Sequence, residues 1–455
     1  MREYTKSLAS WAAKLTYEEL PAEVIEKLKM HMLDMLGCAI AGSDKPEIAQ
    51  MKAAMENCGE TGSARAWGSQ KQLPFANAML VNGAMSHTVE LDDLHKPSKI
   101  HAACVIVPPV LTAAQALGAD GKTVMLALAV GYEIVLRMGM ALGTDSHRRR
   151  GWHATATCGA FGAAAACGVL LGLGEVQMAN ALGLAGTSTG GLMAYTADGS
   201  MSKRLHAGKA AENGWMAASL AKAGFTGPTY VLEASDGGYA HAASDKYDLD
   251  ILLDGLGEKY HILDTGLKFY ACCGHIHQAI DAALQLMREN KLAAEDVASA
   301  KVSTYDVSGM AWGFQRAPQN TVEAQFNIPY AVAVAMCDGQ AFLPQFARER
   351  LGDKKVLDLA ARISVETADR YTVRYPAEWC SGVEITLKDG RQLFREVCGA
   401  KGDPQNPLSE EEVESKFRVL TDGYISAEHQ DALIACVKKT EQLENAARLA
   451  ELLKF

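Results

Sequence analysis

Residues 122–143, KTVMLALAVGYEIVLRMGMALG, constrain the fold more than any other stretch of the chain. Apolar side chains would occupy nearly every side of a helix built from them, and such a helix must be buried on most of its surface. Residues 155–172, 176–186 and 208–224 are also helical in pattern and rich in Ala and Gly. Small side chains let helix backbones come close together, so these segments predict tight packing of helix on helix.

The sequence changes character after about residue 266. Helices are predicted at 274–290 and 320–338, the second preceded by the polar cluster Arg316-Ala317-Pro318. Asp389-Gly390 is a strong hairpin signal between two of the predicted strands. Alternating, β-branched segments predict these strands at 300–306, 362–367, 383–388 and 391–398.

The simplest architecture is a large all-helical domain, residues 1–265 with 405–455, and a smaller α+β domain inserted at 266–404. Pro21 is a typical first residue of a helix. Ser409, followed by the acidic sequence EEEVESKF, predicts the start of the closing helical stretch. The expected fold class is therefore mainly α.

Composition narrows the class of protein. The 455 residues are 49% hydrophobic and 22% charged, as in a soluble globular protein of two or three domains. The net charge of -10 disfavours a nucleic-acid partner. The N-terminus lacks the apolar core of a signal peptide, and no run of about 18 apolar residues occurs, so we expect no membrane partner. Most of the eleven cysteines lie in apolar helical sequence, which predicts buried, reduced side chains and a cytoplasmic location.

Residues 87–101, HTVELDDLHKPSKIH, hold three histidines and three carboxylates. A core helix would not hold so many ionisable groups, because each uncompensated buried charge costs several kcal/mol. Imidazoles that titrate near neutral pH, beside carboxylates that stay ionised, are typical of proton-transfer chemistry. The alternative interpretation is a polar loop with incidental histidines.

Cations gather in two further places. Lys203-Arg204 follows a glycine-rich segment and precedes a predicted helix, where a cation opposes the helix dipole and favours an anion nearby. The alternative is that both side chains face solvent. Lys268 opens the second cluster, KFYACCGHIH, at the predicted domain boundary. Its Cys272-Cys273 pair with two histidines matches no standard zinc spacing, so we expect no metal.

These clusters together supply imidazoles to move protons, carboxylates to orient them and cations to bind carboxylate groups. The set suits elimination, decarboxylation or epimerisation at a carbon next to a carboxylate, because such steps build negative charge that fixed cations stabilise. The glycine-rich GTSTGG lacks the spacing of a nucleotide-binding loop. No thiamine or pyridoxal signature is visible, and we expect no cofactor.

Four motifs resemble the MmgE/PrpD family, which includes 2-methylcitrate dehydratase, cis-aconitate decarboxylase and iminodisuccinate epimerase. They read GAMSHTVELDDLH, GWHATATCGAFGAA, MSKRLHAGKAAENG and LKFYACCGHIH. The resemblance runs nearly end to end. It implies a large helical domain with a smaller α+β domain, an active site between them, and a homodimer.

The resemblance also implies roles for residues at matching positions. At two of these positions the chain differs from mammalian members, which have a histidine in place of Cys273 and an aspartate in place of Glu90. Catalytic roles are predicted for Glu90, Asp93, His101, His153, Lys203 and Lys268. Contact with the substrate is predicted for Arg204, His277, Cys273, Asp92 and His95.

The sequence therefore predicts a cytoplasmic, cofactor-independent lyase acting on a small di- or tricarboxylate. Dehydration of a citrate-like hydroxy acid is the leading reaction. The same site could serve decarboxylation of a cis-aconitate-like acid or epimerisation of an iminodisuccinate-like acid. Two remoter alternatives are a metal-dependent hydrolase using His95, His101, Asp92 and Asp93, and a non-catalytic protein that binds organic acids.

Overall fold

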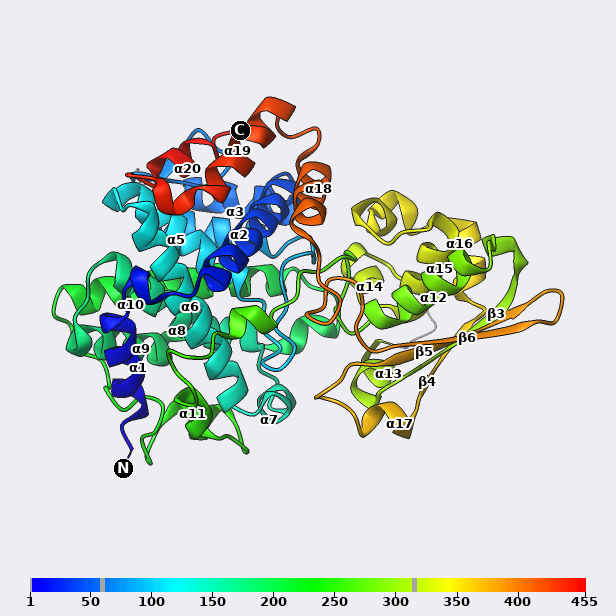
Figure 1. Ribbon diagram of the computed structural model, residues 1–455, viewed down its shortest axis with the longest axis horizontal. Helices are drawn as coiled ribbons and strands as arrows, with labels where there is room; N and C mark the ends of the chain where they lie inside the picture. Colours follow the sequence, from blue (N-terminus) through cyan, green and yellow to red (C-terminus); the bar gives the residue numbers. More distant parts are fainter. Residues whose placement is uncertain (1, 58–61, 313–316) are drawn as a thin grey trace. The chain divides into compact units, whose positions relative to one another are not determined.

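The computed structural model describes residues 2–57, 62–312 and 317–455, so Arg316 lies outside the described residues. The chain forms two compact units (Figure 1). The first unit contains the residues up to Thr88, Asp92–Thr265 and Ser409–Phe455. The second unit contains Gly266–Leu408 together with the short segment Val89–Leu91.

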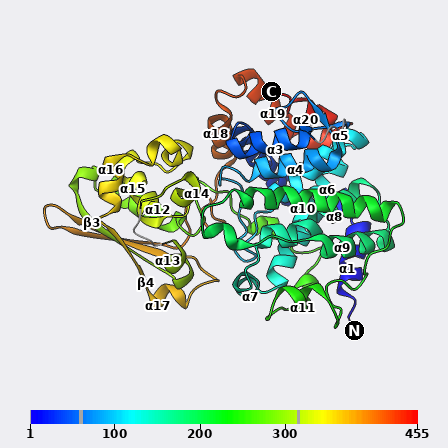
Figure 2. The ribbon, with the colours of Figure 1, turned by 180° about the vertical axis from the view of Figure 1, so that it is seen from behind.

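The first unit is a helical assembly, and the mainly α fold class is confirmed. Helix α10 packs along α4, α8 and α9, as Figure 2 shows from behind. The bounds of the helices are α1 Tyr4–Lys14, α2 Ala22–Gly42, α3 Pro46–Asn57, α4 Phe75–Ser86, α5 Ala103–Leu117, α6 Gly121–Ala141, α7 Thr144–Arg149, α8 Ala154–Leu170, α9 Glu175–Ser188, α10 Ser202–Lys222, α11 Tyr239–Ala243, α18 Glu410–Thr421, α19 Ala427–Lys438 and α20 Ala447–Glu451.

Glycine makes the close helix contacts possible, as the small-residue segments predict. A Cβ atom on Gly208 of α10 would lie 2.1 Å from the carbonyl oxygen of Leu80 in α4. A Cβ atom on Gly214 would lie 2.3 Å from the Cβ of Ala163 in α8. Neither position has room for a side chain, so the backbone of α10 packs directly against α4 and α8.

Helix α6 is the buried helix expected from residues 122–143. By length and composition it could cross a membrane, and it is the one described helix that meets this test. However, 89% of its apolar window is buried inside the unit, as expected of a core helix in a large helical domain. Its N-terminus is capped by the side chain of Asp120, which accepts a hydrogen bond from Thr123 N–H at 2.8 Å.

Two predicted helix starts are confirmed. Pro21 immediately precedes α2. Ser409 caps α18 in a capping box with Glu412, whose side chain accepts a hydrogen bond from the Ser409 N–H at 2.8 Å.

The first unit departs from the prediction of an almost wholly helical segment in three ways. Strands β1 (Ala64–Arg65) and β2 (Gln72–Leu73) form a small antiparallel pair. Residues 224–265 are mostly turns with short helices. Helix α10 begins at Ser202 rather than near residue 208, so the cationic cluster lies in its first turn. Within this turn, Lys203 and Arg204 are buried, while Ser202 and Leu205 are exposed.

The second unit is built on a four-stranded sheet with the order β4-β3-β5-β6. Strand β3 is parallel to β4, while the β3–β5 and β5–β6 pairs are antiparallel. The hairpin predicted at Asp389-Gly390 joins β5 to β6, and Gly390 adopts a φ of 90° there. The strands are β3 Val297–Thr304, β4 Ile363–Thr367, β5 Ser381–Leu387 and β6 Gln392–Val397.

Helices α12 and α15 of this unit pack on each other, and α12 also packs on β5 and β6. The single helix predicted at 320–338 is wrong, because Asn327 interrupts it and caps α15 through its side chain at 2.9 Å from Tyr330 N–H. The bounds are α12 His277–Glu289, α13 Asp306–Trp312, α14 Thr321–Gln325, α15 Ile328–Asp338, α16 Lys354–Ala360 and α17 Asp369–Thr372.

The cysteines follow the prediction in part. Seven of the eight described free cysteines are buried, and Cys337 is half-buried. Cys380 and Cys398 instead form a disulfide, contrary to the expectation of reduced side chains. The register explains the pairing, because Ser381 lies opposite Val397 and the next residues outward therefore face each other. The cytoplasmic location stays a prediction.

Helix α10 leaves an apolar face exposed, which supports the predicted homodimer. Met201, Leu205, Met216 and Leu220 are each between 36% and 49% exposed. We propose that this face is part of an interface between two copies of the chain, in the size class above about 2,000 Å². Light scattering at micromolar concentration should give the mass of a dimer. Replacing Met216 and Leu220 together by Glu should give a monomer.

The control for this experiment is Val176→Glu, because Val176 is 74% exposed on α9. That variant should remain dimeric. A wild-type monomer at micromolar concentration would contradict the proposal.

The glycine contact of α10 gives a test of the packing. Gly208→Ala should lower the free energy of unfolding by about 1–3 kcal/mol, because its Cβ atom would collide with the backbone of α4. Urea denaturation measures the change. Gly190→Ala is the matched control, since a Cβ atom there would meet no atom of the described residues within 4 Å. Equal free energies of unfolding for the two variants would contradict this prediction, because they would show that α4 and α10 can move apart at little cost in free energy.

Candidate active site

Asp93 anchors the polar segment predicted to carry chemistry. Its fully buried carboxylate accepts hydrogen bonds from Tyr132 O–H and from Ala103 N–H, both at 3.0 Å. The Nδ1 atom of His31 in α2 lies 3.0 Å from the same carboxylate. Three elements distant in sequence therefore hold this one side chain, and its catalytic role stays a prediction.

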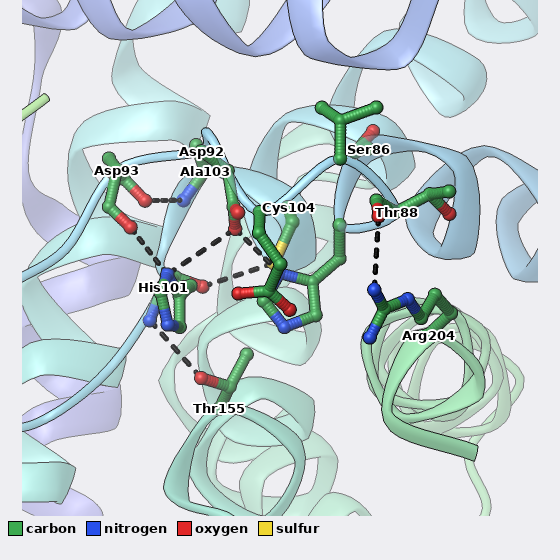
Figure 3. A network of polar contacts seen from close by, with 12 residues as sticks. Ser86, Thr88, Asp92, Asp93, His101, Ala103, Cys104, Thr155 and Arg204 are labelled. Carbon is green, nitrogen blue, oxygen red and sulfur yellow. Dashed lines mark hydrogen bonds and ion pairs between the residues drawn. The ribbon is translucent and has the colours of Figure 1, made fainter. Parts of the chain in front are cut away.

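His101 is oriented by the backbone of the same segment. Its Nδ1 lies 2.6 Å from the carbonyl oxygen of Asp93 and 3.5 Å from the Asp92 carboxylate. Figure 3 shows its ring between these residues and Thr155, whose hydroxyl oxygen accepts the His101 N–H at 3.1 Å. A carbonyl oxygen can only accept, so Nδ1 carries a hydrogen.

Asp92 is paired with His87, a histidine of the same segment. The Nδ1 of His87 donates to the Asp92 carboxylate at 2.7 Å, and both side chains are fully buried. The ring of His87 lies 4.8 Å from the ring of His101 and 6.0 Å from that of His153, between centroids. The segment therefore places an imidazole pair, not a solvated loop, at the end of α4.

One group of side chains could in principle hold a metal ion. Ligand atoms of His87, Asp92 and Cys104 lie within 4.8 Å of one another. The 2.7 Å separation of the first two is a hydrogen bond and is shorter than the roughly 3.3 Å between ligands of a tetrahedral zinc site. Burial also raises the pKa of the Cys104 thiol well above its usual range. The geometry does not fit a metal site.

His153 lies where the sequence predicts, immediately before the small-residue helix α8. It is the N-cap residue of α8, and its N–H donates to the carbonyl oxygen of Gly191 at 3.0 Å. Its Nδ1 lies 3.0 Å from the Nδ1 of His206, and its ring lies 5.7 Å from the ring of Tyr195. Burial and the charge of Lys203 hold the pKa of His153 well below its usual range.

The two cations of α10 are buried, which excludes the interpretation that they face solvent. Lys203 is 3% exposed and Arg204 is 2% exposed. Arg204 donates to the carbonyl oxygen of Thr88 at 3.2 Å, and its Nε lies 3.8 Å from Glu47. Figure 3 shows the first of these contacts. Burial of two cations beside neutral imidazoles makes this part of the first unit electropositive, as a site for an anion requires.

His95 differs from the other predicted histidines. It is fully buried, and its Nδ1 bonds to the Ser98 hydroxyl at 2.8 Å. Residues His95 and Ile100 form an isolated antiparallel bridge that closes the loop between them. Burial, with the nearby imidazole of His261, lowers the pKa of His95 to about 3. These contacts describe a side chain that holds the loop, and its predicted contact with substrate stays a prediction.

The remaining predicted residues belong to the second unit. Lys268 is buried with its Nζ 3.4 Å from the Glu90 carboxylate and 3.2 Å from the Glu90 carbonyl oxygen. Cys273 is buried, and its N–H donates to the carbonyl oxygen of Gln325 at 2.9 Å. The Nε2 of His277 bonds to the carbonyl oxygen of Cys272 at 3.3 Å. The structure thus brings Lys268 to Glu90, a pair 178 residues apart in sequence.

Sequence reasoning missed several polar residues of the first unit. His87 lies in the chosen segment but was given no role, and His206 lies three residues after Lys203. Both could have been found from the sequence, since each belongs to a cluster of ionisable residues. His31 and Tyr132 could not, because each lies in a helix outside these clusters and only the folded chain brings them to Asp93.

Comparison with known proteins places the chain in a family. The MmgE/PrpD N-terminal domain model matches residues 6–250, and the MmgE/PrpD C-terminal domain model matches residues 270–442. The chain belongs to the MmgE/PrpD family. The second match covers most of the α+β unit and continues into α18 and α19 of the first unit.

Curated relatives cover nearly the whole chain. A cis-aconitate decarboxylase of Aspergillus terreus is 29% identical, over 99% of this chain and 95% of the relative. A cis-aconitate decarboxylase-like protein, oryM, of Aspergillus oryzae is 28% identical, over 99% and 96%. The human cis-aconitate decarboxylase is 27% identical, over 100% and 95%. These names agree with the predicted enzyme class, a lyase, and favour decarboxylation over the dehydration that led the prediction.

The burial of His95 predicts a loss of stability in acid. Its pKa of about 3 in the folded chain is below the value of about 6.5 in an unfolded chain. The unfolded state therefore binds more protons between these values, and stability falls as the pH falls below about 6.5. His95→Asn should remove about 2 kcal/mol of the difference in unfolding free energy between pH 7.5 and pH 5.

Denaturant titrations at the two pH values measure this difference. His241→Asn is the control, because His241 is exposed on α11, and it should leave the difference unchanged. A pH dependence in His95→Asn equal to that of the wild type would show that His95 is not buried as a neutral imidazole.

Proposed function

We propose that the protein is a cofactor-independent carboxy-lyase that decarboxylates cis-aconitate or a closely similar unsaturated polycarboxylate. The observation that carries the proposal is the burial of Lys203 and Arg204 beside imidazoles whose basicity is suppressed. Family membership and the decarboxylase relatives support the reaction type.

This decarboxylation can proceed without a cofactor. The bond between a carboxylate carbon and its neighbour breaks, CO₂ leaves, and the electron pair left on carbon takes up one proton. No electron is gained from or lost to another molecule. The enzyme has to hold the remaining carboxylates, stabilise the charge that builds on carbon and deliver the proton.

The residues of the first unit suit these tasks. Lys203 and Arg204 bind carboxylates and stabilise the developing charge. His101 and His153 are the acid–base groups. Asp93 orients His101 through its carbonyl oxygen. We keep Lys268 of the second unit as a predicted carboxylate-binding residue, with Glu90 holding its ammonium group in place.

The other candidate functions have different degrees of support. Dehydration of a citrate-like acid and epimerisation of an iminodisuccinate-like acid would use the same cations and imidazoles. The hydrolase alternative loses support, because Asp92 and Asp93 are engaged by His87, His31 and Tyr132. A binding protein without activity would need the cations but not the oriented imidazoles.

A panel of acids separates these functions. The protein is incubated with cis-aconitate, citrate, 2-methylcitrate and iminodisuccinate, with and without EDTA, and products are followed by NMR and CO₂ release. We expect CO₂ from cis-aconitate, unaffected by EDTA. Water loss from a hydroxy acid without CO₂, turnover that EDTA abolishes, or binding without turnover would each contradict the proposal.

Lys203 provides the sharpest single substitution. Lys203→Ala should lower kcat for cis-aconitate by roughly 10²–10³-fold, the range for loss of one electrostatic stabiliser. Steady-state kinetics and thermal melting measure the effect. The control is Lys209→Ala, because Lys209 is exposed on the same helix in an ion pair with Glu212. A rise in KM with kcat unchanged would show that Lys203 binds only the ground state.

A further inference from the structure

Two imidazoles of the first unit face each other through the same kind of nitrogen. The Nδ1 atoms of His153 and His206 are 3.0 Å apart, and their ring centroids are 5.2 Å apart. His153 caps α8, and His206 lies in the second turn of α10. Only one hydrogen fits between two nitrogens at this distance, so one ring donates and the other accepts.

The surroundings keep both rings neutral near pH 7. Burial lowers the pKa of His206 to about 4, with His87 and Lys203 adding to the effect. Burial and Lys203 also lower the pKa of His153. The titratable groups that face the pair are Lys203 on α10, His87 after α4, His101 before α5 and Tyr195 between α9 and α10.

We propose that His206 is a positioning residue for His153: its Nδ1 accepts the Nδ1–H of His153, so that the Nε2 of His153 exchanges the proton with the substrate. This inference rests on the proposed function, in which His153 is an acid–base group. It assigns His206 a role through His153 and no contact with the substrate.

A neutral acceptor suits this position. Histidines that move protons are commonly oriented by a carboxylate, but a carboxylate here would add negative charge beside a substrate that already carries several. An imidazole accepts the same hydrogen bond without that repulsion. The bond strengthens when His153 becomes an imidazolium, because hydrogen bonds from charged donors are stronger than those from neutral ones.

The second candidate base of the site is held in the same way. The Nδ1–H of His101 is accepted by the carbonyl oxygen of Asp93, which is also neutral. In the proposed direction, each imidazole donates its Nδ1–H to an uncharged acceptor, and the Nδ1 of His101 also lies 3.5 Å from the Asp92 carboxylate.

The kinetic test removes the acceptor. His206→Leu should lower kcat for cis-aconitate by about 10- to 100-fold, the usual cost of losing an orienting partner. The limb of the pH profile at which kcat falls with rising pH should move to lower pH, because the imidazolium of His153 loses its acceptor. His206→Asn should move the limb back toward the wild type, since its side-chain oxygen can accept.

His241→Leu is the control, because His241 is exposed on α11, and it should change neither kcat nor the limb. An unchanged kcat and limb in His206→Leu would overturn the inference. A lower kcat and a lower melting temperature with the limb unmoved would also overturn it, since that result describes a purely structural residue.

A second measurement does not depend on turnover. Nitrogen-15 NMR of the unliganded wild type at pH 7 should show His153 protonated on Nδ1 and His206 protonated on Nε2. The opposite tautomers would overturn the inference. If the wild type does not convert cis-aconitate, the proposed function fails, and the NMR result alone decides the role of His206.

Discussion

The burial of the Lys203 charge at the start of α10, beside the imidazoles of His153 and His206, is the constraint on which the candidate site depends. Removing an ammonium group from water costs several kcal/mol unless its surroundings compensate. Among the neighbouring carboxylates, Asp92 is paired with His87, and Asp93 with Tyr132 and His31. Burial and the charge of Lys203 together lower the pKa of His153 and of His206, and a fixed positive charge favours a substrate that brings negative charge with it.

Close packing makes this burial possible. Gly208 lets α10 approach α4 until a Cβ atom would collide with the backbone, and Lys203 lies one turn and a half earlier on the same helix. The side chains of Lys203 and Arg204 are thereby enclosed rather than left at the surface. In this unit, small residues at the helix contact therefore allow both the close packing of α10 and the burial of its two cations.

The sequence predicts the elements well because their signals are local. The core helix at 122–143, the cap at Ser409 and the turn at Asp389-Gly390 each depend on a few neighbouring residues, and all three are confirmed. The uninterrupted helix at 320–338 is wrong, because apolar periodicity continues through Asn327 while its side chain caps a new helix. Propensity alone does not reveal that competition.

The site could be predicted only in part, for a related reason. The polar motifs revealed His101, His153 and Lys203, which stand in clusters. The partner of Asp93 on α2, His31, lies 62 residues away in sequence, and no local pattern links the two. The pairing of Lys268 with Glu90 likewise joins residues far apart in sequence. Glu90 has a left-handed backbone, with a φ of 57°, which the sequence does not predict for a residue other than glycine.

The most direct test of the account is the number of protons taken up when a polycarboxylate binds. Propane-1,2,3-tricarboxylate, the saturated and unreactive analogue of cis-aconitate, is titrated into the protein at pH 7 by calorimetry in buffers of different ionisation enthalpy. The account predicts uptake of about one proton, because the bound anion offsets the charge of Lys203 and raises the pKa of His153. Binding with no proton uptake, or with proton release, would contradict it.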